Sequence, residues 1–432
     1  MFSFLKKKQP LGLPPASGWK PETSQIPPSE PPERVHALDA VRALALLLGV
    51  FFHSTMSFLP GPQLWVVRDI ESGAISVIFY VSHVFRMTVY FLIAGYFGRL
   101  LLHRVGTRGF IRNRAQRITL PFLVFWPLIL AGMAGAFFWA SSRTGVTLAE
   151  LARLQRAPGP RAAGINAVPL THLWFLYLLS LFYLATLTLR WAASRLDRDG
   201  RFRANVLDRG MRLILATPAS ILFLAAPVAA ALARRPNWQG WIGIQAPAIG
   251  LIPNAGALIG FATAFAFGWL LQRQRALLPA IQQWWLVYSA VAVLLTALCL
   301  AHDGLRPILI PRPGTGAGPL YAACYALAAW AWALGLIGAA QSWWSVERPA
   351  VRYVANASYW IYIVHLPVVM AFQVLVWPLP FPVLVKYLLV VTGALLLVLA
   401  SYDLLVRNTW LGGWLNGKRY PRAFMGAPQV RR

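Results

Sequence analysis

Apolar runs about as long as a bilayer is thick recur along most of this chain and limit what it can fold into. A helix of about 20 apolar residues crosses the hydrocarbon core of a membrane. Such runs lie near residues 38–59, 75–101, 118–140, 172–192, 213–233, 249–271, 283–301, 319–342, 357–377 and 382–406. Because a segment in lipid must satisfy its own backbone hydrogen bonds, each run is expected to be helical. We predict an all-α polytopic membrane protein, a bundle of about ten transmembrane helices.

Composition and charge distribution agree with a membrane protein. Hydrophobic residues make up 58% of the chain, and only 12% of residues are charged, against about 25% in a soluble domain. With ten spans, 27 Lys and Arg residues fall on one side of the membrane and nine on the other. The positive-inside rule places the richer side, with both termini, in the cytoplasm. Since the formal net charge of +27 is then mostly a topology signal, we expect no nucleic-acid partner.

The domain organisation follows from the same pattern. Residues 1–35 include eight prolines and are expected to form a disordered cytoplasmic tail. Residues 36–410 form the ten-helix transmembrane domain, and residues 411–432 form a basic cytoplasmic tail. The two cysteines, Cys299 and Cys324, both lie in apolar segments. They offer neither a disulfide framework nor a metal site.

The stretch "RALALLLGVFFHS" places two polar side chains on one face of an apolar helix. Arg42 and His53 are separated by about three helical turns, or about 16 Å along the axis. Asp39 precedes Arg42 by three residues and could pair with it. One interpretation is structural, with a capping pair and a histidine bonded to a neighbouring helix. The other is functional, because polar groups at bilayer depth are costly and therefore mark sites.

The stretch "HVFRMTVYFLIAGYFGRLL" carries a second buried cation. His83, Arg86 and Tyr90 share a helix face through their i, i+3, i+7 spacing. Arg86 lies near mid-span and needs an anionic or carbonyl partner, and a structural salt bridge is the alternative to a functional role. Gly95 and Gly98 would let another helix approach closely.

A third stretch places arginines at the start of the third span. In "RNRAQRITLPF", Arg114 and Arg117 are one turn apart at the cytoplasmic mouth of the bundle. Contact with lipid headgroups is one explanation for them. A clamp for the phosphates of a charged ligand is the other.

Two further stretches place histidines in the spans. "THLWFLYLLSLFYL" opens the fourth span with His172 and Trp174, and a membrane-interface belt would explain the tryptophan. "NASYWIYIVHLPV" puts His365 one turn after Tyr362 in the ninth span. For His365 the alternative to a functional role is a histidine that simply satisfies its hydrogen bonds inside the bundle.

Together these five stretches resemble the membrane-bound acyltransferase-3 family and, within it, the glucan biosynthesis protein C branch. The Arg–ten residues–His spacing of the first span and the Arg–two residues–Arg pair before the third are that family's signatures. The "HLWFL" and "YIVHLP" elements favour the glucan branch. The resemblance implies O-acyl transfer from cytoplasmic acyl-CoA to extracytoplasmic sugars across the bacterial inner membrane. In the glucan branch it implies succinylation of osmoregulated periplasmic glucans.

Roles for the candidate residues follow from acyl-transfer chemistry, which needs a base, an oxyanion stabiliser and a donor site. We expect His53 to be the general base, since imidazole accepts protons near neutral pH. The catalytic set is His53, Asp39 and Arg42. The donor-binding set is Arg86, Arg114 and Arg117. The acceptor-binding set is His83, His172, Trp174, Tyr362 and His365.

Several alternatives stay open at this level. Arg42 either orders the path of the donor or pairs with Asp39, and Arg86 either stabilises the oxyanion or holds a succinyl carboxylate. Transfer is either direct or through an acyl-histidine, and acetyl-CoA is an alternative donor. No permanently bound cofactor or metal is expected; the partners are acyl-CoA, a periplasmic glucan or other carbohydrate, and the lipid bilayer.

A transporter or a flippase of a sugar or an acylated metabolite is the rival from another class. Transporters often show broken helices at corresponding places in two repeats. In this chain the buried Arg and His residues instead gather in the first, second and fourth spans, with one more histidine in the ninth. We therefore favour the enzyme.

Overall fold

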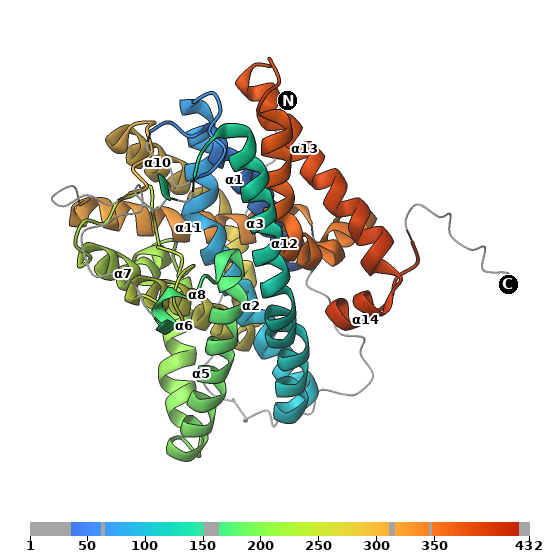
Figure 1. Ribbon diagram of the computed structural model, residues 1–432. Helices are drawn as coiled ribbons and strands as arrows, with labels where there is room; N and C mark the ends of the chain where they lie inside the picture. Colours follow the sequence, from blue (N-terminus) through green and yellow to red (C-terminus); the bar gives the residue numbers. More distant parts are fainter. Residues whose placement is uncertain are drawn as a thin grey trace, which may run out of the picture. The chain divides into compact units, whose positions relative to one another are not determined.

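A computed structural model describes residues 36–61, 65–147, 149–150, 164–310, 316–344 and 348–422. This part of the chain consists of helices and connecting loops and contains no strand. Figure 1 shows the helices in chain order. The first seven are α1 (His36–Thr55), α2 (Gly73–Arg114), α3 (Leu120–Thr144), α5 (Trp174–Leu196), α6 (Arg209–Leu215), α7 (Ser220–Ala233) and α8 (Ala255–Arg273). The others are α9 (Leu278–Gln283), α10 (Trp285–Asp303), α11 (Pro319–Trp343), α12 (Pro349–Val376), α13 (Val383–Ser401) and α14 (Trp410–Asn416).

The predicted all-α polytopic membrane fold is confirmed. Among the described residues, eight helical stretches are long and apolar enough to cross a membrane, or nine if one bent pair counts as a span. One of the eight, Gly73–Thr144, covers the two expected spans 75–101 and 118–140. The ten expected spans therefore correspond to these eight stretches and the bent pair. The expected tail 1–35 lies outside the described residues, as do residues 423–432.

The stretch that covers two spans reverses direction near Gly106. This glycine has φ 67° and ψ 178°, which lie outside the helical region and which a residue with a Cβ rarely adopts. The Tyr183 hydroxyl lies 3.3 Å from Arg114 Nη1 and 3.4 Å from the Ala94 carbonyl oxygen. In one straight helix, residues 94 and 114 would be about 30 Å apart. The chain must therefore double back, and Figure 1 shows it turning at the lower end of α2 and rising again as α3.

Two of the expected spans differ from the prediction. The helix expected over 213–233 is broken into α6 and α7, which meet at 108°. Pro218 lies in the break, and proline cannot continue a helix without losing a backbone hydrogen bond. The helix expected over 249–271 begins only at Ala255, where the Asn254 side chain accepts a hydrogen bond from the Ala257 backbone at 2.9 Å and caps it.

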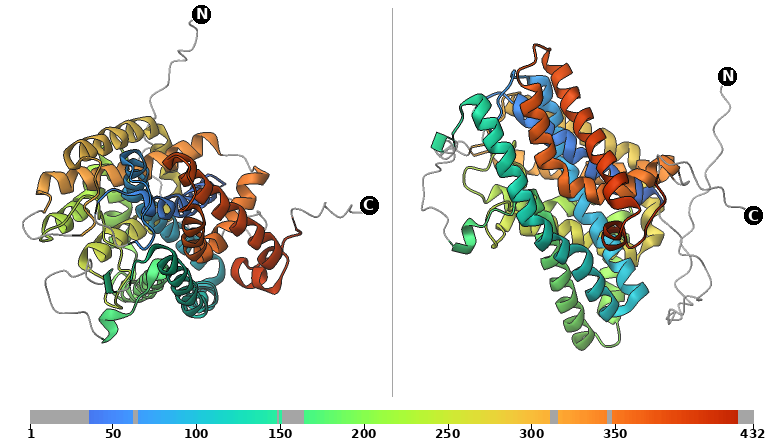
Figure 2. Two further views of the ribbon diagram at one scale, coloured as in Figure 1. Left: turned by 45° about the horizontal axis from the view of Figure 1, so that its top comes forward. Right: turned by 45° about the vertical axis from the view of Figure 1, so that its right-hand side comes forward.

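The first helix lies among the helices that carry the other candidate residues. It contacts α2, α11, α12 and α13, and Figure 2 shows its blue ribbon between them. α2 and α8 also pack closely. A Cβ atom at Gly95 would collide with the carbonyl oxygen of Phe265, and one at Gly268 with that of Leu92. The expected close helix approach at Gly95 is thus confirmed, with α8 as the neighbour.

Part of the expected carboxyl-terminal tail is built into the bundle. α14 lies against the π-helical turn Ala115–Thr119 that joins α2 to α3. The Trp414 indole donates to the Gln116 carbonyl at 2.8 Å, and Arg117 Nη1 donates to the Asn416 carbonyl at 3.3 Å. The described residues after Arg407 therefore line the mouth of the bundle where Arg117 lies.

Candidate active site

Four histidines from separate parts of the sequence, two of them buried and two half-buried, meet around one cavity of about 260 Å³. His53 comes from α1, His83 from α2, His365 from α12, and His172 from the 3₁₀ turn Thr171–Leu173 directly before α5. The ring centroids of His53 and His365 are 5.2 Å apart, and those of His172 and His365 are 5.0 Å apart. Arg86 lines the same cavity. The fold therefore brings the intramembrane polar residues of the sequence together.

Backbone carbonyls fix which ring nitrogen of two histidines carries the proton. His365 Nδ1 lies 2.8 Å from the Tyr362 carbonyl oxygen, and His172 Nε2 lies 3.1 Å from the same oxygen. A carbonyl can only accept, so these nitrogens must donate, and in the neutral rings His365 Nε2 and His172 Nδ1 are acceptors. Both acceptor nitrogens are buried without a hydrogen-bond partner in the described part of the chain. They can take a hydrogen bond or a proton from a substrate.

The other two histidines differ from each other in how their rings are held. His83 Nε2 lies 2.7 Å from the Ile242 carbonyl oxygen, so that ring is also oriented by backbone. His53 Nδ1 is buried and meets no partner among the described residues. The Gln373 amide donates to the His53 carbonyl at 3.0 Å and anchors the end of α1 without touching the ring. No hydrogen bond to Nδ1 holds the His53 ring, so its orientation depends on the side chains packed around it.

A glycine opens the space between α1 and α12 at this point. A Cβ atom at Gly49 would lie 3.5 Å from His365 Nε2. The missing side chain leaves the acceptor nitrogen of His365 accessible from the side of α1, where the His53 ring also lies.

Arg86 is buried, with 8% of its surface exposed, and its contacts leave hydrogen-bond donors free. Its Nη1 lies 3.4 Å from the Leu48 carbonyl oxygen, and its guanidinium carbon lies 4.2 Å above the centre of the Phe52 ring. No carboxylate pairs with Arg86 within the described ranges, so the alternative of a structural salt bridge is not realised there. A buried guanidinium held by a carbonyl and an aromatic face can bind an anion in the cavity.

The remaining predicted acceptor-binding residues also line this cavity. The Tyr362 hydroxyl donates to the His172 carbonyl at 2.8 Å. Trp174 is only 7% exposed, and its ring stacks on Phe261 with centroids 5.4 Å apart. The interpretation of Trp174 as part of a membrane-interface belt is therefore wrong, because its ring lines the cavity and packs inside the protein.

The predicted arginines line a second cavity of about 270 Å³. Arg42, Arg114 and Arg117 all contribute to it. Four residues line both cavities, namely Leu46, Tyr90, Phe175 and Tyr362. The arginine cavity and the histidine cavity are therefore neighbours that share a wall.

The two mouth arginines keep donors available. Arg114 Nη2 donates to Asn113 Oδ1 at 2.7 Å, and Arg117 reaches the Asn416 carbonyl. Neither pairs with a carboxylate in the described part of the chain. The involvement of α14 at Asn416 was missed from the sequence, because nothing in the sequence signals a contact between residues 299 positions apart.

Asp39 and Arg42 form the pair that the spacing allowed, with Arg42 Nη2 3.0 Å from Asp39 Oδ1. Arg42 also lines the second cavity; the pairing is confirmed, and a role in ordering the path of the donor stays a prediction. Asp39 lines neither cavity. It lies 14 residues before His53 on the same helix, about 21 Å away, and its contact with the candidate site runs through Arg42.

Comparison with known families matches residues 35–403 to the acyltransferase-3 family, which is described as "Acyltransferase domain". The chain belongs to this family. It is 35% identical over 100 residues to "Glucans biosynthesis protein C" of Escherichia coli strain K12 and 34% identical over 100 residues to the protein of that name from Escherichia coli O1:K1. Each match covers 23% of this chain and 26% of the relative. No solved structure matches the chain.

Membership of the acyltransferase-3 family agrees with the donor and acceptor groups around the two cavities. The histidine cavity offers proton acceptors and a guanidinium, as acyl transfer requires. In the described ranges no three His, Cys, Asp or Glu side chains are placed to hold a metal ion. The side chains around the two cavities offer acid–base and electrostatic chemistry.

Proposed function

We propose that this acyltransferase moves an acyl group, succinyl in the first instance, from cytoplasmic acyl-CoA to a hydroxyl of a periplasmic glucan or another extracytoplasmic carbohydrate. The observation that carries the proposal is the shared wall of the two cavities. One is lined by Arg114 and Arg117, which have no carboxylate partner among the described residues, and the other by histidines with bare ring nitrogens. The name of the Escherichia coli relatives supports a glucan as the acceptor class.

His53 is the proposed general base, with His365 as its positioning residue. In the proposed reacting arrangement, one nitrogen of His53 donates to His365 Nε2, a bond that the structure itself does not contain, and the other takes the proton of the sugar hydroxyl. The ring centroids are 5.2 Å apart, close enough for one hydrogen bond to form between the imidazoles once the rings are aligned. The sugar oxygen attacks the thioester carbonyl carbon, the carbon–sulfur bond breaks, and the proton passes to the leaving thiolate of CoA. An acyl-histidine is the alternative intermediate.

Arginines hold the charged parts of the donor in this mechanism. Arg114 and Arg117 bind the nucleotide phosphates of CoA at the mouth, where the Asn416 carbonyl holds the Arg117 side chain and the Tyr359 hydroxyl holds the Arg117 backbone carbonyl. The pantetheine arm then passes the shared wall at Tyr362. Arg86 holds the distal carboxylate of a succinyl group, or stabilises the oxyanion of the tetrahedral intermediate when the acyl group carries no charge.

The proposed location is the bacterial inner membrane, with both termini in the cytoplasm. The excess of 27 over nine basic residues supports this orientation. A reporter fused after Arg432 that is active only in the cytoplasm should be active. Activity of a periplasm-only reporter at the same position would reverse the topology and the direction of transfer.

The decisive experiment is a transfer assay with the purified full chain, labelled succinyl-CoA and a periplasmic glucan. An acyltransferase releases one free CoA for each label that appears on sugar. A transporter or flippase releases none. Omission of the acceptor distinguishes direct transfer from transfer through an acyl-histidine. Label on the protein under those conditions indicates the acyl-histidine.

A further inference from the structure

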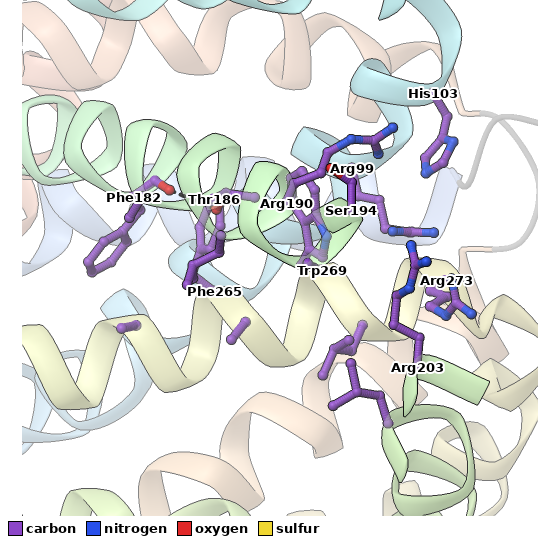
Figure 3. A pocket seen from close by; sticks show the side chains of 17 residues that line it. Arg99, His103, Phe182, Thr186, Arg190, Ser194, Arg203, Phe265, Trp269 and Arg273 are labelled. Carbon is purple, nitrogen blue, oxygen red and sulfur yellow. Dashed lines mark hydrogen bonds between the residues drawn. The ribbon is translucent and has the colours of Figure 1, made fainter. Parts of the chain in front are cut away.

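A third cavity of about 620 Å³ lies between α2, α5 and α8, and no assigned role uses it. It shares no lining residue with the histidine cavity or the arginine cavity. A molecule bound there cannot touch the proposed base. We call it the lateral cavity, and Figure 3 shows its lining side chains.

The lateral cavity has a cationic end and an apolar end (Figure 3). The cationic end is formed by Arg99, Arg190, Arg203 and Arg273, with the His103 ring beside them. The apolar part is lined by Phe182, Ala185, Leu189, Ala262, Phe265 and Ala266. An occupant that suits both ends is an anion joined to a hydrocarbon chain.

The positive charge of the cationic end is only partly balanced. Arg203 Nε pairs with Asp197 Oδ2 at 2.7 Å, and Arg273 Nε pairs with Asp208 Oδ1 at 2.6 Å. Arg99 and Arg190 have no carboxylate partner in the part of the chain that the structure describes. Arg99 Nε is also buried there without a hydrogen-bond partner. Two guanidinium groups are therefore available for an anion from outside the protein.

The position of the lateral cavity favours an occupant from the bilayer. All three helices that form it are candidate membrane spans. Next to the cavity, α5 exposes large apolar side chains that include Leu184, Leu189 and Trp191. In the proposed topology the cationic end faces the cytoplasmic leaflet, where anionic lipids attract basic residues.

We propose that the lateral cavity binds a phospholipid with an anionic headgroup. The headgroup phosphate lies between Arg99 and Arg190, and one acyl chain runs along Phe182 and Phe265. Arg203 and Arg273 stay paired with their aspartates and add positive potential without being the primary ligands. Because the cavity is separate from the proposed active site, this inference does not depend on the proposed acyl transfer; only the choice of leaflet rests on the proposed topology.

The test is equilibrium binding of labelled phosphatidylglycerol to the delipidated full chain in neutral detergent. We expect saturable binding of phosphatidylglycerol, and much weaker binding of phosphatidylcholine with the same chains. Arg99→Gln and Arg190→Gln should each weaken phosphatidylglycerol binding roughly five- to tenfold. The matched control is Arg195→Gln, because Arg195 is on α5 but does not line the cavity.

Variants that leave the charges intact test the apolar end. Ala266→Trp should fill the path of the acyl chain and abolish phosphatidylglycerol binding. Ala290→Trp, at an exposed position on α10, is the control and should bind normally. Native phosphatidylglycerol affinity in both Ala266→Trp and the Arg99→Gln Arg190→Gln double variant would overturn the proposal.

Competition experiments identify the source of the anion. Inorganic phosphate and coenzyme A are added at concentrations far above that of the lipid. Retention of phosphatidylglycerol in both cases supports a lipid site. Full displacement by coenzyme A, lost in Arg99→Gln, would make the cavity a nucleotide site, and full displacement by phosphate would make it a simple anion site. Either result contradicts the lipid proposal.

Discussion

His172 and Tyr362 hold each other through reciprocal hydrogen bonds. His172 Nε2 lies 3.1 Å from the Tyr362 carbonyl oxygen, and the Tyr362 hydroxyl donates to the His172 carbonyl at 2.8 Å. The same Tyr362 carbonyl accepts from His365 Nδ1. One residue of α12 therefore orients two histidines and joins the start of α5 to α12. Tyr362 also lines both cavities of the proposed site.

Tyr362→Phe removes one bond of this pair and should reduce acyl transfer. The loss of a hydrogen bond worth about 0.5–1.5 kcal/mol corresponds to a decrease of roughly two- to tenfold in kcat. Tyr359→Phe is the matched control, because that hydroxyl donates to the Arg117 carbonyl near the mouth and should chiefly change KM for acyl-CoA. Identical kinetic effects of the two variants would show that the cavities are not functionally distinct.

His53→Ala should abolish transfer while the protein still inserts and accumulates. Loss of a general base costs about 10²–10⁴-fold in rate. His302→Ala, an exposed histidine at the end of α10, is the control and should transfer normally. Near-normal kcat in His53→Ala would remove His53 from the mechanism.

His365→Ala should also lower kcat, and His365→Gln should recover part of the loss. The glutamine amide oxygen can still accept the hydrogen bond that we assign to His365 Nε2. Comparison of kcat and KM for the two variants distinguishes positioning from packing. If His365→Gln is as inactive as His365→Ala at equal protein levels, His365 does more than orient His53.

Arg114→Ala and Arg117→Ala should raise KM for acyl-CoA with a smaller effect on kcat. Each lost charge-assisted hydrogen bond should cost about 1.5–3 kcal/mol of binding free energy. Arg112→Ala is the control, because Arg112 is exposed on the same helix and does not line the cavity. An unchanged KM together with a collapse of kcat would contradict the phosphate clamp.

Arg86→Lys tests whether Arg86 holds the acyl carboxylate. The substitution keeps the charge but loses the two parallel donors that grip a carboxylate. We expect kcat/KM to fall more for succinyl-CoA than for acetyl-CoA, whereas Arg42→Lys should leave the ratio of the two unchanged. If Arg86→Lys also leaves that ratio unchanged, the guanidinium does not hold the carboxylate.

Asp69→Asn should destabilise the protein. Lys386 Nζ lies 2.8 Å from Asp69 Oδ1, and both side chains are only 5% exposed. Removal of one partner from a buried ion pair leaves an uncompensated charge and costs about 3–5 kcal/mol. A lower thermal midpoint in detergent checks this. Asp199→Asn, in an exposed pair with Arg201, is the control, and an equal shift in both variants would contradict a special contribution from the buried pair.

The sequence by itself determined the fold class and most of the candidate site. A span is helical because hydrocarbon tolerates no unpaired backbone, and its apolar run is about 20 residues long because it must cross the bilayer. The spans could therefore be found without tertiary information. Polar residues inside these runs are costly, so His53, His83, Arg86, His172 and His365 stood out in the same way.

Only the tertiary structure decided which of these residues meet and how they are held. The ring tautomers of His172 and His365 depend on carbonyls of another turn or another helix, and their positions follow from helix packing. The docking of α14 on Arg117 and the Asp69–Lys386 pair likewise have no local signature. Contacts between distant parts of the chain depend on how the helices pack. A local sequence pattern shows only that a polar group lies in an apolar run, where its burial is costly.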